Sequence, residues 1–411
     1  MRRWGPGDRL AVWTYVQAGE EVAAGDPSVT DAERAAAGRE TLEALRESIL
    51  PENRSRAGAQ YAADALPEGE DVMRVWRPRD PAGLRDRLGS AQTLAVWAED
   101  DVLDVLWRGQ ASEVQLAGGV QPRMWPVEGT DDLWEASLQI RRLDEALISV
   151  MVMPRPADGD WPAQLTERFV WRGPAAPAAP ADEPLRGTVT EYTLDSAALR
   201  GPRQVTVYRP PGSARLAGCV LADGEATRSF AAVLDGAITA GAVPPVLLVG
   251  VHNAAERARS WPDRRSQEYL PGINRRRFDA HMRFVADEVV GWAGEQFGPV
   301  EGPWISSGFS SGAAWAIAAA RRRPEVFGAV AAFSAGMVPK RISGQLRSAR
   351  VRQYLAAGTL EPPFRRATRE WADRLARAGL PCRHEEWVGG HDPLWWERQL
   401  PVALAWLLSP S

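Results

Sequence analysis

Hydrophobic residues follow two different patterns along this chain of 411 residues. From about Thr93 to Met153, short segments alternate apolar and polar residues, and turn residues such as Gly118-Gly119 separate them. The clearest segments are 102–107, 113–116, 133–138 and 147–152. Period-two strands of this length and spacing predict a β-sandwich of roughly the immunoglobulin type.

From about residue 204 onward, continuous apolar strands alternate with helical periods. The strands are expected at 204–208, 219–222, 246–251, 304–307, 329–333 and 353–357, and a last one near 383–388. The helices are expected at 229–240, 277–297, 313–322, 365–378 and 394–408. This alternation predicts βαβ units and a sheet covered on both faces, which is the α/β class.

These patterns divide the chain into four parts. Residues 1–90 are a mixed N-terminal region, with a strand-like start at 9–16 and a helix-like stretch at 31–50, and they suggest no function. Residues 91–172 are the expected β-sandwich, 173–184 a Pro/Ala linker, and 185–411 the α/β domain.

Composition narrows the choice of partner and compartment. The 49 basic and 53 acidic residues give a net charge of −4, which argues against nucleic acid as the main partner. No apolar stretch is long enough to span a membrane, and none follows Arg2-Arg3 as a signal peptide requires. Two cysteines, Cys219 and Cys382, are too few for a disulfide framework or a zinc knuckle, so we expect a cytoplasmic protein.

The sharpest local motif is Gly308-Phe309-Ser310-Ser311-Gly312, which lies between an expected strand and an expected helix. This is the setting of a nucleophile elbow, in which the serine sits on a strained turn at the helix N-terminus. Ser310 would then be the nucleophile, and the Ser311 N–H would help to hold an oxyanion. The alternative is an ordinary Ser/Gly loop before a helix.

A nucleophilic serine needs a base, and only His384 and His391 of the four histidines follow Ser310 in the chain. In hydrolases with a nucleophile elbow, the histidine follows the serine and the acid along the chain. His384 lies within an expected strand, whereas His391 lies in the loop Gly389-Gly390-His391-Asp392 after it, at the carboxyl edge of the sheet. We therefore favour His391.

The acid is expected in the loop 358–363, where Glu361 is the only carboxylate. Its role would be to fix the tautomer of His391, although a glutamate at the start of a helix is the alternative. Asp392 is a weaker choice, because it is adjacent to the base. A second oxyanion donor is expected at Gly224–Glu225, where Asp223 has the alternative role of capping the turn.

These motifs together resemble the enterochelin (enterobactin) esterases and the wider esterase D-like branch of the α/β-hydrolases. The resemblance covers about residue 185 to the C-terminus and more weakly the expected sandwich, since enterochelin esterases carry such a sandwich before the hydrolase domain. It rests on five stretches: 221–224, 265–272, 308–312, 357–362, and 389–392 with Trp396 five residues after the histidine.

The resemblance implies the triad Ser310, Glu361 and His391, with Ser311, Gly224 and Glu225 forming the oxyanion hole. It also implies hydrolysis of the serine-lactone backbone of a ferric catecholate siderophore and release of its iron. Such ligands are anionic and aromatic, so Arg257 and Arg265 are expected to meet the charge and Trp396 to stack on a catechol. The alternatives are a solvated arginine-rich loop and a core tryptophan.

We therefore expect a serine carboxylic-ester hydrolase that acts on a small-molecule ester and needs neither a metal nor an organic cofactor. An esterase D-like esterase or an acyltransferase would use the same three residues on another substrate or acceptor. A non-catalytic glycan-binding relic is the alternative from a different class. The pattern leaves the oligomeric state open.

Overall fold

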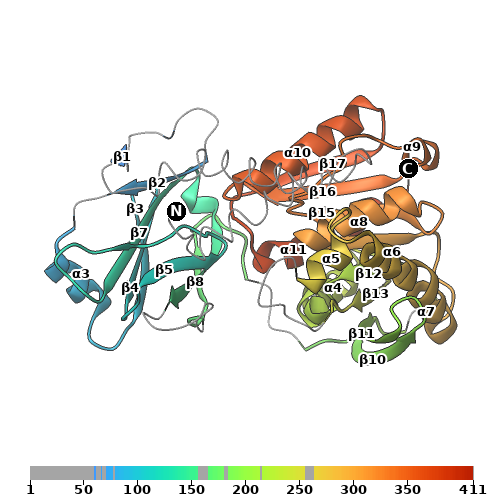
Figure 1. Ribbon diagram of the computed structural model, residues 1–411, viewed down its shortest axis with the longest axis horizontal. Coiled ribbons are helices and arrows are strands. Elements are labelled where there is room, and N and C mark those ends of the chain that lie inside the picture. The colour runs from blue at the N-terminus through green and yellow to red at the C-terminus, as the bar shows by residue number, and fades with distance from the viewer. Residues whose placement is uncertain are drawn as a thin grey trace.

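The computed structural model describes residues 60–61, 66, 71–76, 79–155, 165–179, 184–212, 215–254 and 263–410. These residues form two bodies side by side (Figure 1): two β-sheets come before the Pro/Ala-rich segment, and one α/β body follows it. The strand and the helix expected at 9–16 and 31–50 lie outside the described residues.

The N-terminal body consists of a six-stranded sheet in the order β1-β2-β7-β4-β3, with β6 paired to β7, and a three-stranded sheet β5-β8-β9. Among the described strands of this body, every pair is antiparallel except the short pair β1–β2. Side chains from both sheets, such as Val105 and Ile148, share one buried cluster. The elements are β1 (Gln60–Tyr61), β2 (Val72–Trp76), α3 (Pro81–Leu88), β3 (Leu94–Glu99), β4 (Val102–Arg108), β5 (Glu113–Gly118), β6 (Trp125–Pro126), β7 (Leu133–Ile140), β8 (Leu147–Arg155) and β9 (Phe169–Arg172).

This body begins earlier in the chain than the alternating pattern indicates. β2 pairs with β7 from Val72 to Val75, and α3 follows it, so both precede residue 91. The pattern conceals β2 because Arg74, in the middle of that strand, is a buried arginine over the ring of Trp125. A charged residue in the interior of a strand hides the period-two signal.

The α/β body is built on an eight-stranded mixed sheet in the order β10-β11-β13-β12-β14-β15-β16-β17. The pairs β10–β11 and β11–β13 are antiparallel, and the strands from β13 to β17 are parallel. The strands are β10 (Thr188–Ser196), β11 (Gly201–Arg209), β12 (Ala217–Ala222), β13 (Val246–Val251), β14 (Trp304–Phe309), β15 (Phe327–Phe333), β16 (Arg352–Gly358) and β17 (Cys382–Trp387). The expected α/β class is confirmed.

Helices cover both faces of this sheet. Adjacent residues Val220 and Leu221 of β12 enter different cores: one core holds residues of α6, α7, α8 and α10, and the other holds residues of α4 and α11. Burial of both faces explains why these strands are apolar throughout. The helices are α4 (Thr227–Thr239), α5 (Arg264–Tyr269), α6 (Arg275–Arg283), a π-helical segment (Phe284–Val289), α7 (Val290–Phe297), α8 (Ser311–Arg322), α9 (Gly344–Ala349), α10 (Pro362–Arg377) and α11 (Pro393–Leu407).

The parallel strands bring the candidate residues to one edge of the sheet. Since β12, β14, β15, β16 and β17 run in the same direction, the loops at their carboxyl ends meet there. Those loops carry residues 223–225, 310, 334, 361 and 391. Chain segments far apart in sequence therefore meet at a single site.

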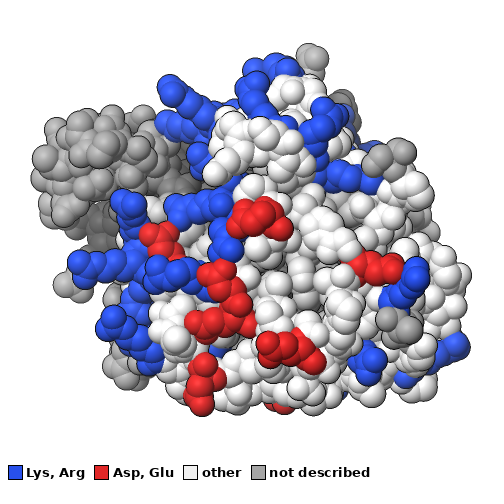
Figure 2. Space-filling view, turned by 90° about the vertical axis from the view of Figure 1, so that its right-hand side faces the viewer, with Lys and Arg blue, Asp and Glu red and all other residues white. Residues whose placement is uncertain are grey.

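The outer surface of the α/β body carries charges of both signs. On the end of the molecule seen in Figure 2, Lys and Arg side chains gather along the margin, and carboxylates lie among and beside them. Within the described part of the chain, no helix combines the length and the apolar character needed to cross a bilayer.

Candidate active site

Ser310 occupies a strained turn between β14 and α8. Its backbone angles are φ 56° and ψ −126°, a conformation that L-residues with a side chain rarely adopt. The turn is tight, because a Cβ placed on Gly308 would lie 2.4 Å from the carbonyl oxygen of Gly312. The strand therefore presents the half-buried Ser310 at its carboxyl end, directly before the first turn of α8.

The start of α8 lies against the end of β12. A Cβ on Gly312 would come within 3.0 Å of the Cβ of Ala222 and 3.3 Å of the Asp223 carboxylate. The absence of a side chain at residue 312 thus allows the serine turn and the loop after β12 to approach each other. The first N–H groups of a helix have no partner within the helix, and Ser311 is the first residue of α8.

The loop after β12 turns sharply at Asp223, whose φ is 62°. The next residue is restricted to glycine, because a Cβ on Gly224 would lie 2.4 Å from the carbonyl oxygen of Gly250. The Glu225 carboxylate accepts a hydrogen bond from the Asn253 N–H at 3.1 Å, and its side chain is 46% exposed. The expected oxyanion turn is therefore a rigid backbone element beside Ser311.

Arg265 holds this turn from α5. Its Nε and one terminal nitrogen each donate to the Asp223 carboxylate at 2.6 Å, and the Asp223 N–H donates to the Tyr269 hydroxyl at 2.9 Å. Burial lowers the pKa of Arg265, but the Asp223 carboxylate more than offsets this effect, so the pKa is raised. The guanidinium is thus committed to Asp223. Arg257, the other arginine expected to meet an anionic ligand, lies outside the described residues.

Glu361 and His391 are in direct contact. The distance from His391 Nδ1 to Glu361 Oε2 is 2.7 Å. The other carboxylate oxygen of Glu361 accepts from the Gly358 N–H at 2.7 Å and from the Ser334 hydroxyl at 2.6 Å. The Glu361 side chain is only 3% exposed. One oxygen is thus fixed by the protein frame while the other orients the imidazole, whose Nε2 faces away from the carboxylate.

Aromatic rings surround the imidazole. The ring of Phe364 lies 4.0 Å from that of His391, and Trp396 meets His391 edge-on at 4.7 Å. Trp396 stacks on Phe309 at 4.5 Å and donates its indole N–H to the Ser334 hydroxyl at 2.8 Å. Trp396 is 4% exposed, which leaves no free face for a ligand. In this structure the indole is packed against Phe309 and His391 and bonded to Ser334.

The alternative acid and base lie elsewhere. His384 is on β17, where its nearest carboxylate partner is Glu386, with Nε2 3.9 Å from Oε1. Both oxygens of Asp392 accept backbone hydrogen bonds, from Ser149 N–H and from Leu394 N–H. The structure therefore brings Glu361 and His391 into contact, and Ser310 and the turn after β12 lie at the same carboxyl edge of the sheet.

Ser334 and Phe364 were not predicted from the sequence. Ser334 follows the expected strand 329–333, which pairs with the strand before Ser310, so its place at the carboxyl end of that strand could have indicated it. Its left-handed backbone, with φ 54°, carried no signal, because nothing in the local sequence distinguishes it. Phe364 lies in the first turn of α10, three residues after Glu361.

Comparison with known proteins gives one family match. The model of the family described as putative esterase matches residues 196–407. Those residues include the serine turn, the Glu361 loop and the His391 loop. No curated protein matches the sequence significantly.

Solved structures of enterobactin esterases are similar to this chain in fold. An enterochelin esterase from Shigella flexneri matches with a TM-score of 0.57 and 19% identity, over 77% of this chain and 96% of that one. The Shigella flexneri enterobactin esterase in the presence of enterobactin matches with a TM-score of 0.56 and 18% identity, over 77% of this chain and 95% of that one. A ferric enterobactin esterase from Salmonella typhimurium matches with a TM-score of 0.57 and 19% identity, over 77% of this chain and 96% of that one. The matched share of this chain is larger than the α/β body alone, so the similarity in fold extends into the N-terminal sheets.

Proposed function

The chain belongs to the putative esterase family and is a carboxylic-ester hydrolase, and from this premise we propose that Ser310, His391 and Glu361 form its catalytic triad. The observation that carries the proposal is the 2.7 Å contact between His391 Nδ1 and Glu361 Oε2, at the sheet edge where Ser310 occupies its strained turn. A nucleophile, a base and an orienting acid in this chain order are the parts that acyl transfer needs.

In the proposed mechanism, His391 Nε2 accepts the proton of the Ser310 hydroxyl as that oxygen attacks the ester carbonyl. Glu361 keeps the proton on Nδ1 and stabilises the imidazolium. The Ser311 N–H and an N–H of the Gly224–Glu225 turn stabilise the oxyanion. His391 returns the proton to the leaving alcohol, and water then releases the acyl group in a second cycle of the same steps.

We propose a catecholate siderophore lactone of the ferric enterobactin type as the substrate. The support is the fold similarity to the enterobactin esterases of Shigella flexneri and Salmonella typhimurium, together with aromatic rings near the imidazole such as Phe364. For Arg265 and Trp396 we now propose supporting roles, because their polar groups are committed to Asp223 and Ser334. Arg257 remains the proposed contact for the ligand's charge.

We also interpret the two N-terminal sheets as an immunoglobulin-like β-sandwich that precedes the hydrolase domain. The support is the cluster of buried side chains that the two sheets share. Residues 173–184 would be the linker between the two domains.

The test is a liquid chromatography–mass spectrometry time course with ferric enterobactin and, in parallel, a short-chain aryl ester. The wild-type protein should release linear dihydroxybenzoylserine products, and Ser310→Ala should lower kcat/KM on both substrates by at least about 10³-fold. Ester turnover that persists in Ser310→Ala would contradict the triad. Serine-dependent aryl-ester turnover without cleavage of the siderophore would refute the substrate but not the mechanism.

A second variant tests the acid. Glu361→Gln should lower kcat by about 10³-fold, because the amide cannot stabilise the imidazolium. Glu370→Gln is the matched control, since Glu370 is an exposed glutamate of the same helix that pairs with Arg374. Equal activity of the two variants would refute the role of Glu361.

A further inference from the structure

The loop that carries His391 is attached to the N-terminal body by hydrogen bonds to β8. The Leu147 N–H donates to the Val388 carbonyl at 3.2 Å, and the Trp395 indole N–H donates to the Leu147 carbonyl at 2.9 Å. The Ser149 N–H donates to Asp392 Oδ2 at 2.7 Å. These contacts flank the histidine on both sides in sequence.

Asp392 is the charged member of this attachment. It is fully buried, and its carboxylate accepts one N–H from each body: Ser149 from β8 and Leu394 from the first turn of α11. Burial raises the pKa of this carboxyl, although the two N–H donors oppose the shift. A helix N-cap needs only the second of these bonds. The first has no role within the helix and joins the two bodies.

The backbones of the two bodies also meet directly at this loop. A Cβ on Gly390 would lie 1.5 Å from the carbonyl oxygen of Gly119, which follows β5. Leu360 and Val388, which immediately precede the acid and the histidine loop, are buried in the hydrophobic cluster of the N-terminal sheets. The segments that carry the proposed acid and base are therefore packed partly against the core of the N-terminal body.

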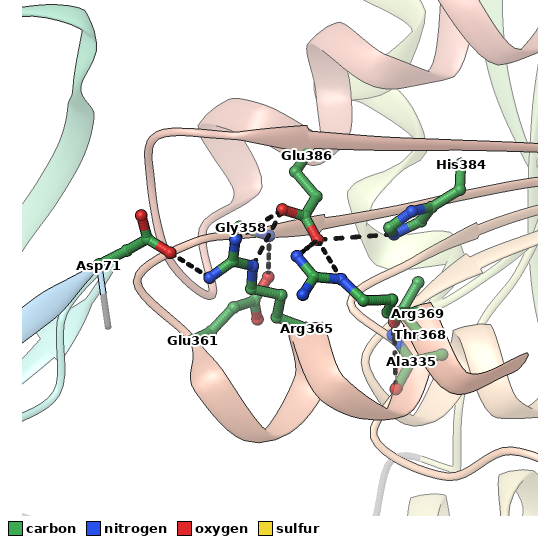
Figure 3. A network of polar contacts seen from close by, with 9 residues as sticks. All are labelled: Asp71, Ala335, Gly358, Glu361, Arg365, Thr368, Arg369, His384 and Glu386. Atoms are coloured by element: carbon green, nitrogen blue, oxygen red, sulfur yellow. Dashed lines mark hydrogen bonds and ion pairs between the residues drawn. The ribbon is translucent and has the colours of Figure 1, made fainter. Parts of the chain in front are cut away.

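A further contact joins the N-terminal body to α10, the helix that begins directly after Glu361. Asp71, at the start of β2, forms an ion pair with Arg365, and Arg365 also donates to Glu386 of β17 at 2.9 Å (Figure 3). Arg365 lies one helical turn after Glu361, and its N–H donates to the Glu361 carbonyl at 3.0 Å. The N-terminal body thus contacts both elements that carry the acid and the base.

We propose that the N-terminal sheets brace the catalytic triad and that Asp392 is the positioning residue through which β8 holds the His391 loop. The inference rests on the proposed function, because it assigns the base to His391. A displacement of about 1 Å between reacting groups can cost about 10²-fold in rate. The brace therefore acts on kcat and not on the affinity for a small ester.

The test compares Asp392→Ser with Asp80→Ser, using the full chain and a short-chain aryl ester. Serine keeps the N-cap of α11 but is too short to reach the Ser149 N–H as well. Asp80 is an exposed N-cap of α3 that bonds only within its own helix start, so Asp80→Ser is the matched control. Asp392→Ser should lower kcat by about 10- to 100-fold, with KM within about threefold, and Asp80→Ser should leave both unchanged.

A second variant covers the case in which Asp392→Ser does not fold. Trp395→Phe removes the N–H donor to Leu147 and keeps an aromatic ring in place. Trp97→Phe is its control, because the buried indole nitrogen of Trp97 has no hydrogen-bond partner. Trp395→Phe should lower kcat severalfold and slow the labelling of Ser310 by a fluorophosphonate, and Trp97→Phe should do neither.

The outcomes separate this inference from the proposed function. If hydrolysis by the wild type does not depend on Ser310, the proposed function fails. If it does depend on Ser310 but Asp392→Ser retains the wild-type kcat, the brace is refuted while the triad stands. If kcat falls only in proportion to the unfolded fraction measured by thermal denaturation, Asp392 has a purely structural role, and the positioning proposal is also refuted.

Discussion

At the scale of single residues, the orientation of Glu361 depends on Ser334. The Ser334 hydroxyl donates a hydrogen bond to Glu361 Oε1 and accepts one from the indole N–H of Trp396. Ser334→Ala should lower kcat by about tenfold and destabilise the fold by about 1–2 kcal/mol, because it removes one bond to the carboxylate and leaves a buried N–H unpaired. Ester kinetics and denaturant unfolding measure the two effects.

Ser306→Ala is the matched control for this prediction. Ser306 is a buried serine of β14, the strand before the nucleophile, and its hydroxyl donates to the Ala316 carbonyl at 2.9 Å. This change should cost similar stability and leave kcat unchanged. An equal loss of kcat in both variants would show that Ser334 acts only through stability.

Residues whose chemistry is visible in their type and order could be predicted at this scale. Glu361 and His391 were predicted as a pair, and the structure has them in contact. The pairing of Arg265 with Asp223 was not predicted, because residues 42 positions apart become partners only through the fold. An arginine in the sequence looks the same whether it faces a ligand or a buried carboxylate.

At the scale of elements, the buried histidine of α6 makes stability depend on pH. His281 is enclosed by the rings of Tyr269, Phe284 and Trp315, and neither of its ring nitrogens has a hydrogen-bond partner. Burial lowers its pKa to about 4; Glu268 opposes that shift and Arg203 adds to it. The unfolded chain binds this proton at a higher pH than the folded chain does, so stability is lost as pH falls from about 6.5 toward 4.

The corresponding prediction concerns His281→Phe. Between pH 7 and pH 5, the wild type should lose about 2 kcal/mol more unfolding free energy than the variant, since only the wild type takes up this proton on unfolding. Urea denaturation at the two pH values measures the difference. The same pH dependence in both proteins would mean that His281 titrates normally in the folded state.

Strands buried on both faces were the elements that the sequence predicted best. β13 spans the expected residues 246–251, because both of its neighbours and both layers of helices require apolar residues. β10 was missed: it pairs only with β11 at the edge of the sheet, and polar residues occupy most of its length. The expected helix 277–297 is present with a π-helical segment at Phe284–Val289, which the periodicity did not show.

At the scale of the whole molecule, a substitution at Gly390 tests whether the two bodies must approach each other closely. Gly390→Ala should lower both the unfolding midpoint and kcat, because its Cβ would overlap the Gly119 carbonyl and push the His391 loop away from the N-terminal body. Gly344→Ala is the control, since a Cβ there meets nothing within 4 Å. A variant Gly390→Ala with wild-type stability and activity would show that the approach is not needed.

The sequence indicated two bodies but not the contacts between them. Patterns of hydrophobic residues report burial within an element, and the contacts of β8 with residues 388–395 are made largely by backbone groups and a single carboxylate. Asp392 was considered only as a possible acid. Its partner, the N–H of Ser149, lies 243 positions away and leaves no trace in the local pattern.

The distance in sequence between Ser149 and Asp392 determines when the two bodies can be joined during synthesis of the chain. Ribosomes add about 5–20 residues per second, so roughly 10–50 s pass between the synthesis of β8 and that of Asp392, 243 residues later. During that interval the N–H of Ser149 and the carbonyl of Leu147 lack the partners that residues 392 and 395 provide in the folded protein. A nascent chain that ends before residue 391 contains the serine turn and the proposed acid but lacks the proposed base. Ester hydrolysis would therefore begin only after residue 391 has been synthesised, however early the N-terminal sheets fold.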